Sequence, residues 1–136
     1  MKTKNRIDII GYVGKDPEAS ETSAGTPIAR FNVATTERWK GKDTQLHEHT
    51  DWHRVVFFGP AATQILDYVR KGSLVEVEGS LRSRTYEKDG STRYAVEIRG
   101  AEWRVFDRRP GAEEAAPAAG VEPPLSDPPA DDDLPL

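Results

Sequence analysis

Aromatic and basic side chains alternate along residues 50–58 of the sequence. Successive side chains of an extended strand point to opposite faces, so Trp52, Arg54 and Phe58 share one face. An arginine aimed into a small closed barrel would be an unpaired buried charge, which makes this face the predicted outer one. The outer set is Trp52, Arg54, Val56 and Phe58, and the inner set is His53, Val55 and Phe57.

A second stretch, residues 74–87, repeats the alternation, and one of its two sides becomes basic and aromatic toward the end. The inward set is predicted to be Val75, Val77, Gly79 and Leu81, and the outward set Glu76, Glu78, Ser80, Arg82, Arg84 and Tyr86. The two outward sets together place several rings between cations.

Trp39 is a further candidate, because it is predicted to open the hydrophilic loop of residues 40–43, which could not bury an indole. A single exposed ring more often packs against a second core or a subunit. Several rings interleaved with cations suit single-stranded nucleic acid, whose bases stack on flat side chains and whose phosphates need neutralising. Such stacking tolerates many base sequences.

The elements that must position these side chains are mostly strands. Asp89-Gly90 is typical of a two-residue hairpin turn. Strands are predicted near residues 6–13, 27–38, 50–58, 74–87 and 92–106.

A single helix is predicted after Gly59-Pro60, where apolar residues recur at helical spacing. Arg70 and Lys71 suit its last turn, and Gly72 suits the cap beyond it. Five strands with one helix after the third are the order of an oligonucleotide/oligosaccharide-binding (OB) barrel. The predicted fold class is therefore mostly β, a five-stranded OB-fold barrel.

The charge distribution divides the 136 residues into a body, residues 1–109, and a tail, residues 110–136. All 19 Lys and Arg lie in the body; residues 1–110 carry a net charge of +3, and residues 111–136 carry −7. The tail is rich in proline and alanine and has no aromatic ring, which predicts a disordered segment. The sequence has no cysteine and no apolar run long enough for a bilayer, so we expect a soluble, unexported protein.

Two alternatives compete with nucleic-acid binding. An enzyme is disfavoured, because the sequence has neither a phosphate loop nor Gly-x-Ser-x-Gly, and no cofactor is expected. His47, His49, Asp51 and His53 share one parity and could meet at a metal, but a polar loop flanking a strand explains them more simply, so no metal site is predicted. A barrel that acts as a protein adaptor stays open, because the body is only mildly basic.

Four stretches together resemble the bacterial single-stranded DNA-binding protein family: residues 13–18 (VGKDPE), 32–35 (NVAT), 50–59 (TDWHRVVFFG) and 68–84 (YVRKGSLVEVEGSLRSR). The resemblance covers about residues 5–106 and the last six residues. It implies a non-enzymatic OB-fold homotetramer that coats single-stranded DNA in replication, recombination and repair. It also implies a cytoplasmic, nucleoid-associated location.

The resemblance further implies which residues bind. The stacking positions are Trp39, Trp52, Phe58 and Tyr86, and the cationic contacts are Lys40, Lys42, Arg54, Lys71, Arg82 and Arg84. The partner-binding tip is Asp131, Asp132, Asp133, Leu134, Pro135 and Leu136. Leu136 stands where the family usually ends in an aromatic ring, and Tyr86 where it often has tryptophan.

Overall fold

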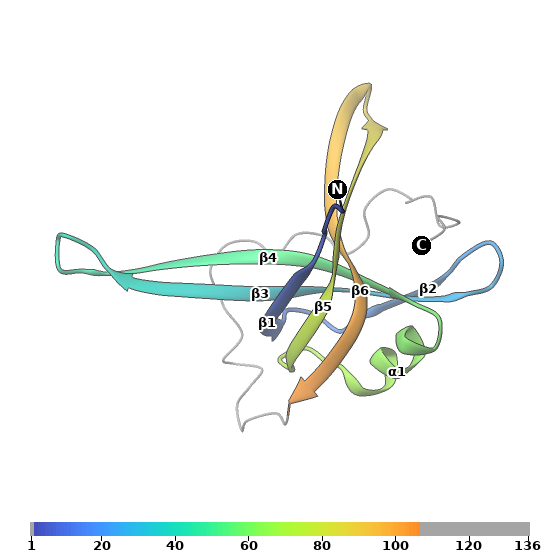
Figure 1. Ribbon diagram of the computed structural model, residues 1–136, viewed down its shortest axis with the longest axis horizontal. Helices are drawn as coiled ribbons and strands as arrows, with labels where there is room; N and C mark the ends of the chain where they lie inside the picture. The colour runs from blue at the N-terminus through green and yellow to red at the C-terminus, as the bar shows by residue number, and fades with distance from the viewer. Residues whose placement is uncertain (1, 107–136) are drawn as a thin grey trace.

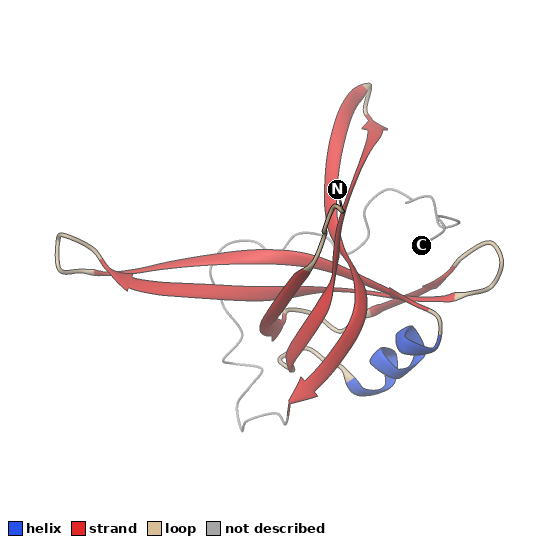
Figure 2. Ribbon diagram, in the orientation of Figure 1, coloured by secondary structure: helices blue, strands red, loops and turns tan. Residues whose placement is uncertain are grey.

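The computed structural model describes residues 2–106, which form six strands and one helix (Figures 1 and 2). The elements are β1 (Ile7–Val13), β2 (Glu18–Glu21), β3 (Pro27–Lys40), β4 (Leu46–Phe58), α1 (Pro60–Tyr68), β5 (Leu74–Lys88) and β6 (Ser91–Phe106). The predicted acidic tail, with its partner-binding tip, lies outside the described residues.

One sheet closes on itself to make the barrel. Its strand order is β1-β5-β6-β4-β3-β2, and the additional pairing of β1 with β3 closes it. Neighbouring strands pair antiparallel except β4 and β6, which pair in parallel at Val55↔Ile98 and Val56↔Arg99. The predicted five-stranded barrel with a helix between the third and fourth predicted strands is confirmed.

The barrel core is made by the inward side chains of the strands. Phe31 and Phe57 stack with ring centroids 6.3 Å apart, and both rings are buried. Gly100 faces Phe57, and a Cβ at this position would collide with the phenyl ring. Helix α1 packs fully buried Ala62 and Ile65 against the same core and lies beside β3 and β4 (Figure 1). The predicted inward positions of Val55 and Phe57 are confirmed.

Two hairpins extend beyond the barrel. The β3–β4 hairpin forms one arm and the β5–β6 hairpin forms a second, in a different direction (Figure 1). Asp89 and Gly90 both have positive φ, 53° and 76°, as a two-residue type I′ turn requires. Lys88 pairs with Ser91 across this turn, so the predicted hairpin is confirmed.

The predicted elements need correction in two places. The short strand β2 was not predicted, because its four residues are all exposed and show no apolar alternation. Helix α1 ends at Tyr68, before the basic residues expected in its last turn. Arg70 lies beyond the helix and donates from Nη1 to the carbonyls of Leu66 and Val69, 2.7 and 2.9 Å away.

Leu81 was expected inside the barrel but is 46% exposed. A β-bulge shifts the β5–β6 register between Glu78↔Glu102 and Gly79↔Gly100. Opposite Leu81, Ile98 of β6 is still buried in the core, whereas Val96 and Tyr94, farther along the inward side of the arm, are 41% and 67% exposed. Within residues 2–106, no helix has the length and apolar character that crossing a bilayer requires.

His53 lies at the end of the inward side of β4 and is half-buried. Its Nε2 is 2.8 Å from Thr35 Oγ1. Burial lowers the pKa of His53 below its ordinary value, and the carboxylate of Asp51 partly opposes this shift. The folded protein therefore resists protonation of His53 more than the unfolded chain does.

We predict that this residue makes stability depend on pH. As the pH falls through the ordinary imidazole pKa of about 6.5, the unfolded chain takes up a proton that the folded protein resists, so the free energy of unfolding decreases. Thermal melts at pH 7.5 and 5.5 should show a larger fall in Tm for the wild type than for His53→Gln. An equal fall in the two proteins would contradict the assignment.

Candidate nucleic-acid interface

The strand register brings basic and aromatic residues of four strands onto one surface, which we call the outer face. Directly opposed residues of paired strands share a face, so the register identifies its members. They are Arg30, Asn32 and Ala34 of β3, Trp52, Arg54, Val56 and Phe58 of β4, Ser80, Arg82, Arg84 and Tyr86 of β5, and Arg93, Ala95, Glu97 and Arg99 of β6. Six of the ten predicted binding residues lie on this face.

The β4 part of the outer face is partly covered by its neighbours. Trp52, Arg54 and Phe58 are half-buried, and Val56 between them is completely buried. The sequence pattern placed Val56 on the outward side but could not show that Arg30 and Arg99 flank it in the register. The Nε1 atom of Trp52 is enclosed and has no hydrogen-bond partner among the described residues.

The outward side of β5 changes charge along its length. Glu76 and Glu78 lie at the barrel end, where Glu78 forms an ion pair of 3.0 Å with Arg6. Toward the tip of the arm the same side carries Arg84 and Tyr86, and the Arg84 guanidinium lies 5.3 Å from the centroid of the Tyr86 ring. Phosphate binding is therefore favoured on the arm and opposed at the barrel end.

Arg99 is a member of the outer face that the sequence analysis missed. Its guanidinium lies over the Phe58 ring, 4.5 Å from the centroid, and the residue is only 7% exposed. Its Nε and Nη1 atoms have no hydrogen-bond partner among residues 2–106. Burial lowers the pKa of Arg99, nearby Arg82 acts in the same direction, and Glu97 opposes both.

The hairpin turn could have revealed Arg99. A two-residue turn at Asp89-Gly90 pairs Lys88 with Ser91, and counting back along both strands pairs Ser80 with Arg99. Arg99 then shares the face of the outward β5 residues. Arg30 and Asn32 of β3 also belong to the outer face and were not predicted. Both line a small pocket, together with Phe31, Arg54, Val55, Arg84 and Glu97.

Trp39 lies inside β3, and not at the start of a loop as the sequence suggested. It is opposite His47 in the β3–β4 register, and the two rings stack with centroids 5.6 Å apart and an interplanar angle of 22°. Along β3, Trp39 points to the same side as the core residue Phe31. Trp52 is opposite Ala34, which points to the other side of β3, so Trp39 and Trp52 lie on opposite sides of the hairpin. The indole is 47% exposed because the arm has left the barrel.

The predicted lysines are spread over two regions. Lys40 ends β3 and Lys42 lies in the turn that follows, so both belong to the β3–β4 arm. Lys71 lies between α1 and β5, where its backbone N–H donates to Asp16 Oδ1 at 2.8 Å. It is therefore at the opposite end of β5 from Tyr86, and the structure does not bring it onto the outer face.

The histidines of β4 bond to different partners. His47 Nε2 lies 3.1 Å from Asp43 Oδ1, and His49 Nε2 lies 3.0 Å from Asp51 Oδ1. Between residues 2 and 106, no group of three or more His, Cys, Asp or Glu side chains gathers at metal-binding distance.

A closed barrel with rings and cations on its outer face defines an OB-fold protein of the nucleic-acid-binding class. Residues 4–106 match the model of the Single-strand binding protein family, and the chain belongs to this family. It is 42% identical over 111 residues to Single-stranded DNA-binding protein 1 of Xylella fastidiosa (strain 9a5c), covering 80% of this chain and 82% of that protein.

Solved structures agree with this assignment. The Plasmodium falciparum SSB in complex with ssDNA superposes with a TM-score of 0.73 at 32% identity, covering 79% of this chain and 98% of that chain. A deletion mutant of the single-stranded DNA binding protein from Thermus aquaticus gives a TM-score of 0.69 at 30% identity, covering 78% of this chain and 52% of that chain.

We predict that Trp39→Ala and Trp52→Ala each weaken binding of oligo-dT, by about 1 to 3 kcal/mol per ring, as loss of one stacking platform does. Both proteins should keep the circular dichroism spectrum of the folded barrel. Tyr68→Ala is the matched control, because Tyr68 is an exposed ring on α1, away from the outer face. If Trp52→Ala did not fold, the indole would belong to a core and the stacking role of Trp52 would be contradicted.

Proposed function

We propose that this protein binds single-stranded DNA with little sequence preference and coats it during replication, recombination and repair. Bases stack on Trp39, Trp52, Phe58 and Tyr86, while arginines of the outer face neutralise phosphates. The observation that carries the proposal is the register of β3, β4, β6 and β5, which aligns the rings of Trp52, Phe58 and Tyr86 with arginines on the outer face. No bond is made or broken in this activity; the product is protected, unpaired DNA.

The two arms extend the path beyond the barrel. Trp39, Lys40 and Lys42 lie on the β3–β4 arm, and Arg84 and Tyr86 lie on the β5–β6 arm (Figure 1). A bound strand passes from one arm across the outer face of the barrel to the other. Lys71 supplies a separate phosphate contact near α1.

We propose a homotetramer as the working form. The edge of β1 supports this proposal: the strand pairs with β5 from Ile7 to Tyr12, whereas its pairing with β3 is confined to Tyr12 and Val13. Among the described residues, no strand pairs with the other edge of β1 from Ile7 to Gly11, so a strand of a second copy can pair there. Ile10, in this segment, is 53% exposed.

The acidic C-terminal tip is proposed to recruit replication, recombination and repair proteins. Its support is the sequence of the tip, in which Asp131, Asp132 and Asp133 precede Leu134, Pro135 and Leu136. Carboxylates followed by apolar side chains suit a basic groove with an apolar pocket on the partner. We also propose a cytoplasmic, nucleoid-associated location, because the proposed ligand is DNA.

The test is a titration of tryptophan fluorescence with oligo-dT at several salt concentrations, with the mass measured by light scattering. Emission should be quenched, and the logarithm of the affinity should fall with that of the salt concentration by about 0.7 per phosphate contact. Arg54→Ala and Arg82→Ala should each reduce this slope by about one contact. Arg104→Ala is the control, since Arg104 pairs with Glu76 at the acidic end of β5. Emission that stays constant at low salt would favour the protein-adaptor alternative.

The charge of the tail generates a further prediction. Residues 111–136 carry −7 and compete with DNA for the basic surface, so a protein truncated after residue 110 should bind oligo-dT with equal or higher affinity. The difference should shrink as the salt concentration rises. A large loss of affinity on truncation would show that the tail contributes to DNA binding.

A further inference from the structure

One of the two faces of the Trp39 indole is already covered by a neighbouring side chain. The His47 imidazole lies against the indole, with ring centroids 5.6 Å apart. The two residues are directly opposed in the β3–β4 register, so the contact is built into the pairing of the strands. One face of the indole packs against the histidine, and Trp39 keeps 47% of its surface exposed.

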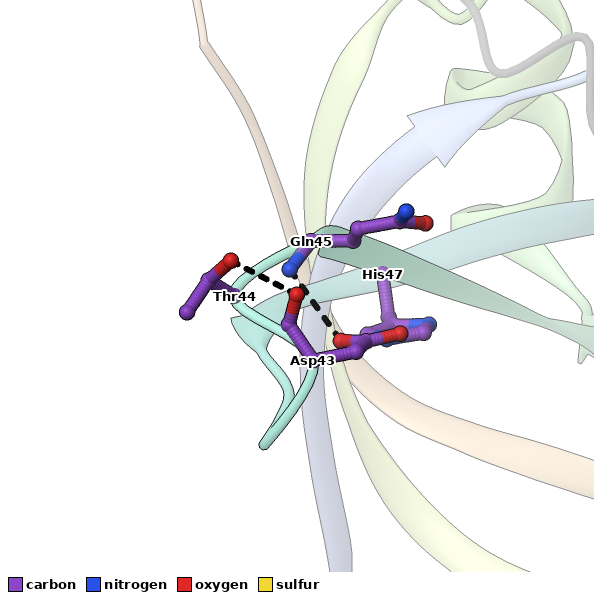
Figure 3. Close-up of polar contacts among 4 residues, drawn as sticks. All are labelled: Asp43, Thr44, Gln45 and His47. Atoms are coloured by element: carbon purple, nitrogen blue, oxygen red, sulfur yellow. Dashed lines mark hydrogen bonds and ion pairs between the residues drawn. The ribbon is translucent and has the colours of Figure 1, made fainter.

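His47 is in turn held by the turn of the hairpin, as Figure 3 shows. Its Nε2 lies 3.1 Å from Asp43 Oδ1, and the same carboxylate oxygen accepts the backbone N–H of Gln45 at 3.1 Å. The Gln45 N–H and then His47 lower the pKa of the Asp43 carboxyl. Asp43 therefore ties the imidazole to the backbone of the turn.

Gly41 leaves the space that this arrangement needs. A Cβ at this position would lie 2.7 Å from His47 Nε2 and 2.8 Å from Asp43 Oδ1, so any larger residue displaces the pair. The backbone of Gly41 also accepts the N–H of Thr44, which has a φ of 62°, and donates to the carbonyl of Gln45. The turn thus keeps a chain of contacts from its backbone through Asp43 and His47 to Trp39.

We infer that His47 is a positioning residue for the stacking platform: held by Asp43 above Gly41, it fixes the Trp39 indole so that a single base stacks on the uncovered face. This rests on the proposed function, in which Trp39 binds a base. The physical gain is preorganisation, because an indole already held by a neighbour loses less conformational freedom when a base binds. His47 itself needs no contact with the nucleic acid.

The test is a double-mutant cycle for oligo-dT binding at pH 8. His47→Ala should weaken binding about two- to tenfold, the range that corresponds to ordering one side chain on binding. The slope of affinity against salt should stay unchanged, because no phosphate contact is lost. In a Trp39→Ala background, His47→Ala should have no further effect, since the histidine acts through the indole.

Two variants and a spectroscopic readout separate positioning from simple loss of structure. His47→Phe should restore affinity by stacking on the indole, whereas Gly41→Ala should weaken binding with both rings present. In protein labelled with 5-fluorotryptophan, the 19F resonance of Trp39 is assigned by its loss in Trp39→Phe. This resonance should shift in His47→Ala, and in His47→Phe it should lie closer to its wild-type position. Circular dichroism checks that each variant is folded.

The outcomes distinguish this inference from the proposed function. If the wild type fails to bind oligo-dT, the proposed function is wrong. If the wild type binds and His47→Ala binds equally well, the positioning role is overturned while the function stands. An equal loss on His47→Ala in the wild-type and Trp39→Ala backgrounds would also overturn it, because the histidine would then contact DNA directly.

Discussion

The barrel depends on a short closing contact between β1 and β3. Only two pairs, Tyr12↔Ala34 and Val13↔Val33, join these strands. Gly11 permits the approach, since a Cβ there would collide with the Ala34 carbonyl oxygen. Because the contact is short, β3 and β4 run on together beyond the barrel as an arm (Figure 1). A longer closure would have kept these strands in the barrel wall.

The arms change the meaning of strand alternation. Inside the barrel, one side of each strand is buried and the other meets solvent, so parity separates core from surface. On an arm both sides meet solvent, and a residue of core parity becomes available for binding. Trp39 and Tyr94, which is opposite Thr85 in the β5–β6 register, are clear cases, exposed at 47% and 67%. A path for DNA over the arms can therefore use both sides of a ribbon.

Companion side chains accompany three of the four proposed stacking rings. Arg99 lies over Phe58, Arg84 lies over Tyr86, and His47 stacks on Trp39. Guanidinium groups and imidazoles are flat and polarisable, so they hold an aromatic ring in place while leaving its other face open. In the proposed function, an arginine in this position also supplies positive charge for the phosphate that follows a stacked base. Ring orientation and charge are thus supplied by the same contacts.

Alternation and turn chemistry in the sequence determined the strands, the single helix, the Asp89-Gly90 hairpin and the outward side of Trp52, Arg54 and Phe58, because these depend on neighbours along the chain. Pairing across strands decided the rest. The burial of Arg99 against Phe58, the stacking of His47 on Trp39 and the distance of Lys71 from the outer face depend on register, closure and a β-bulge. Each depends on which residues are paired across strands, and alternation along a single strand does not record that pairing.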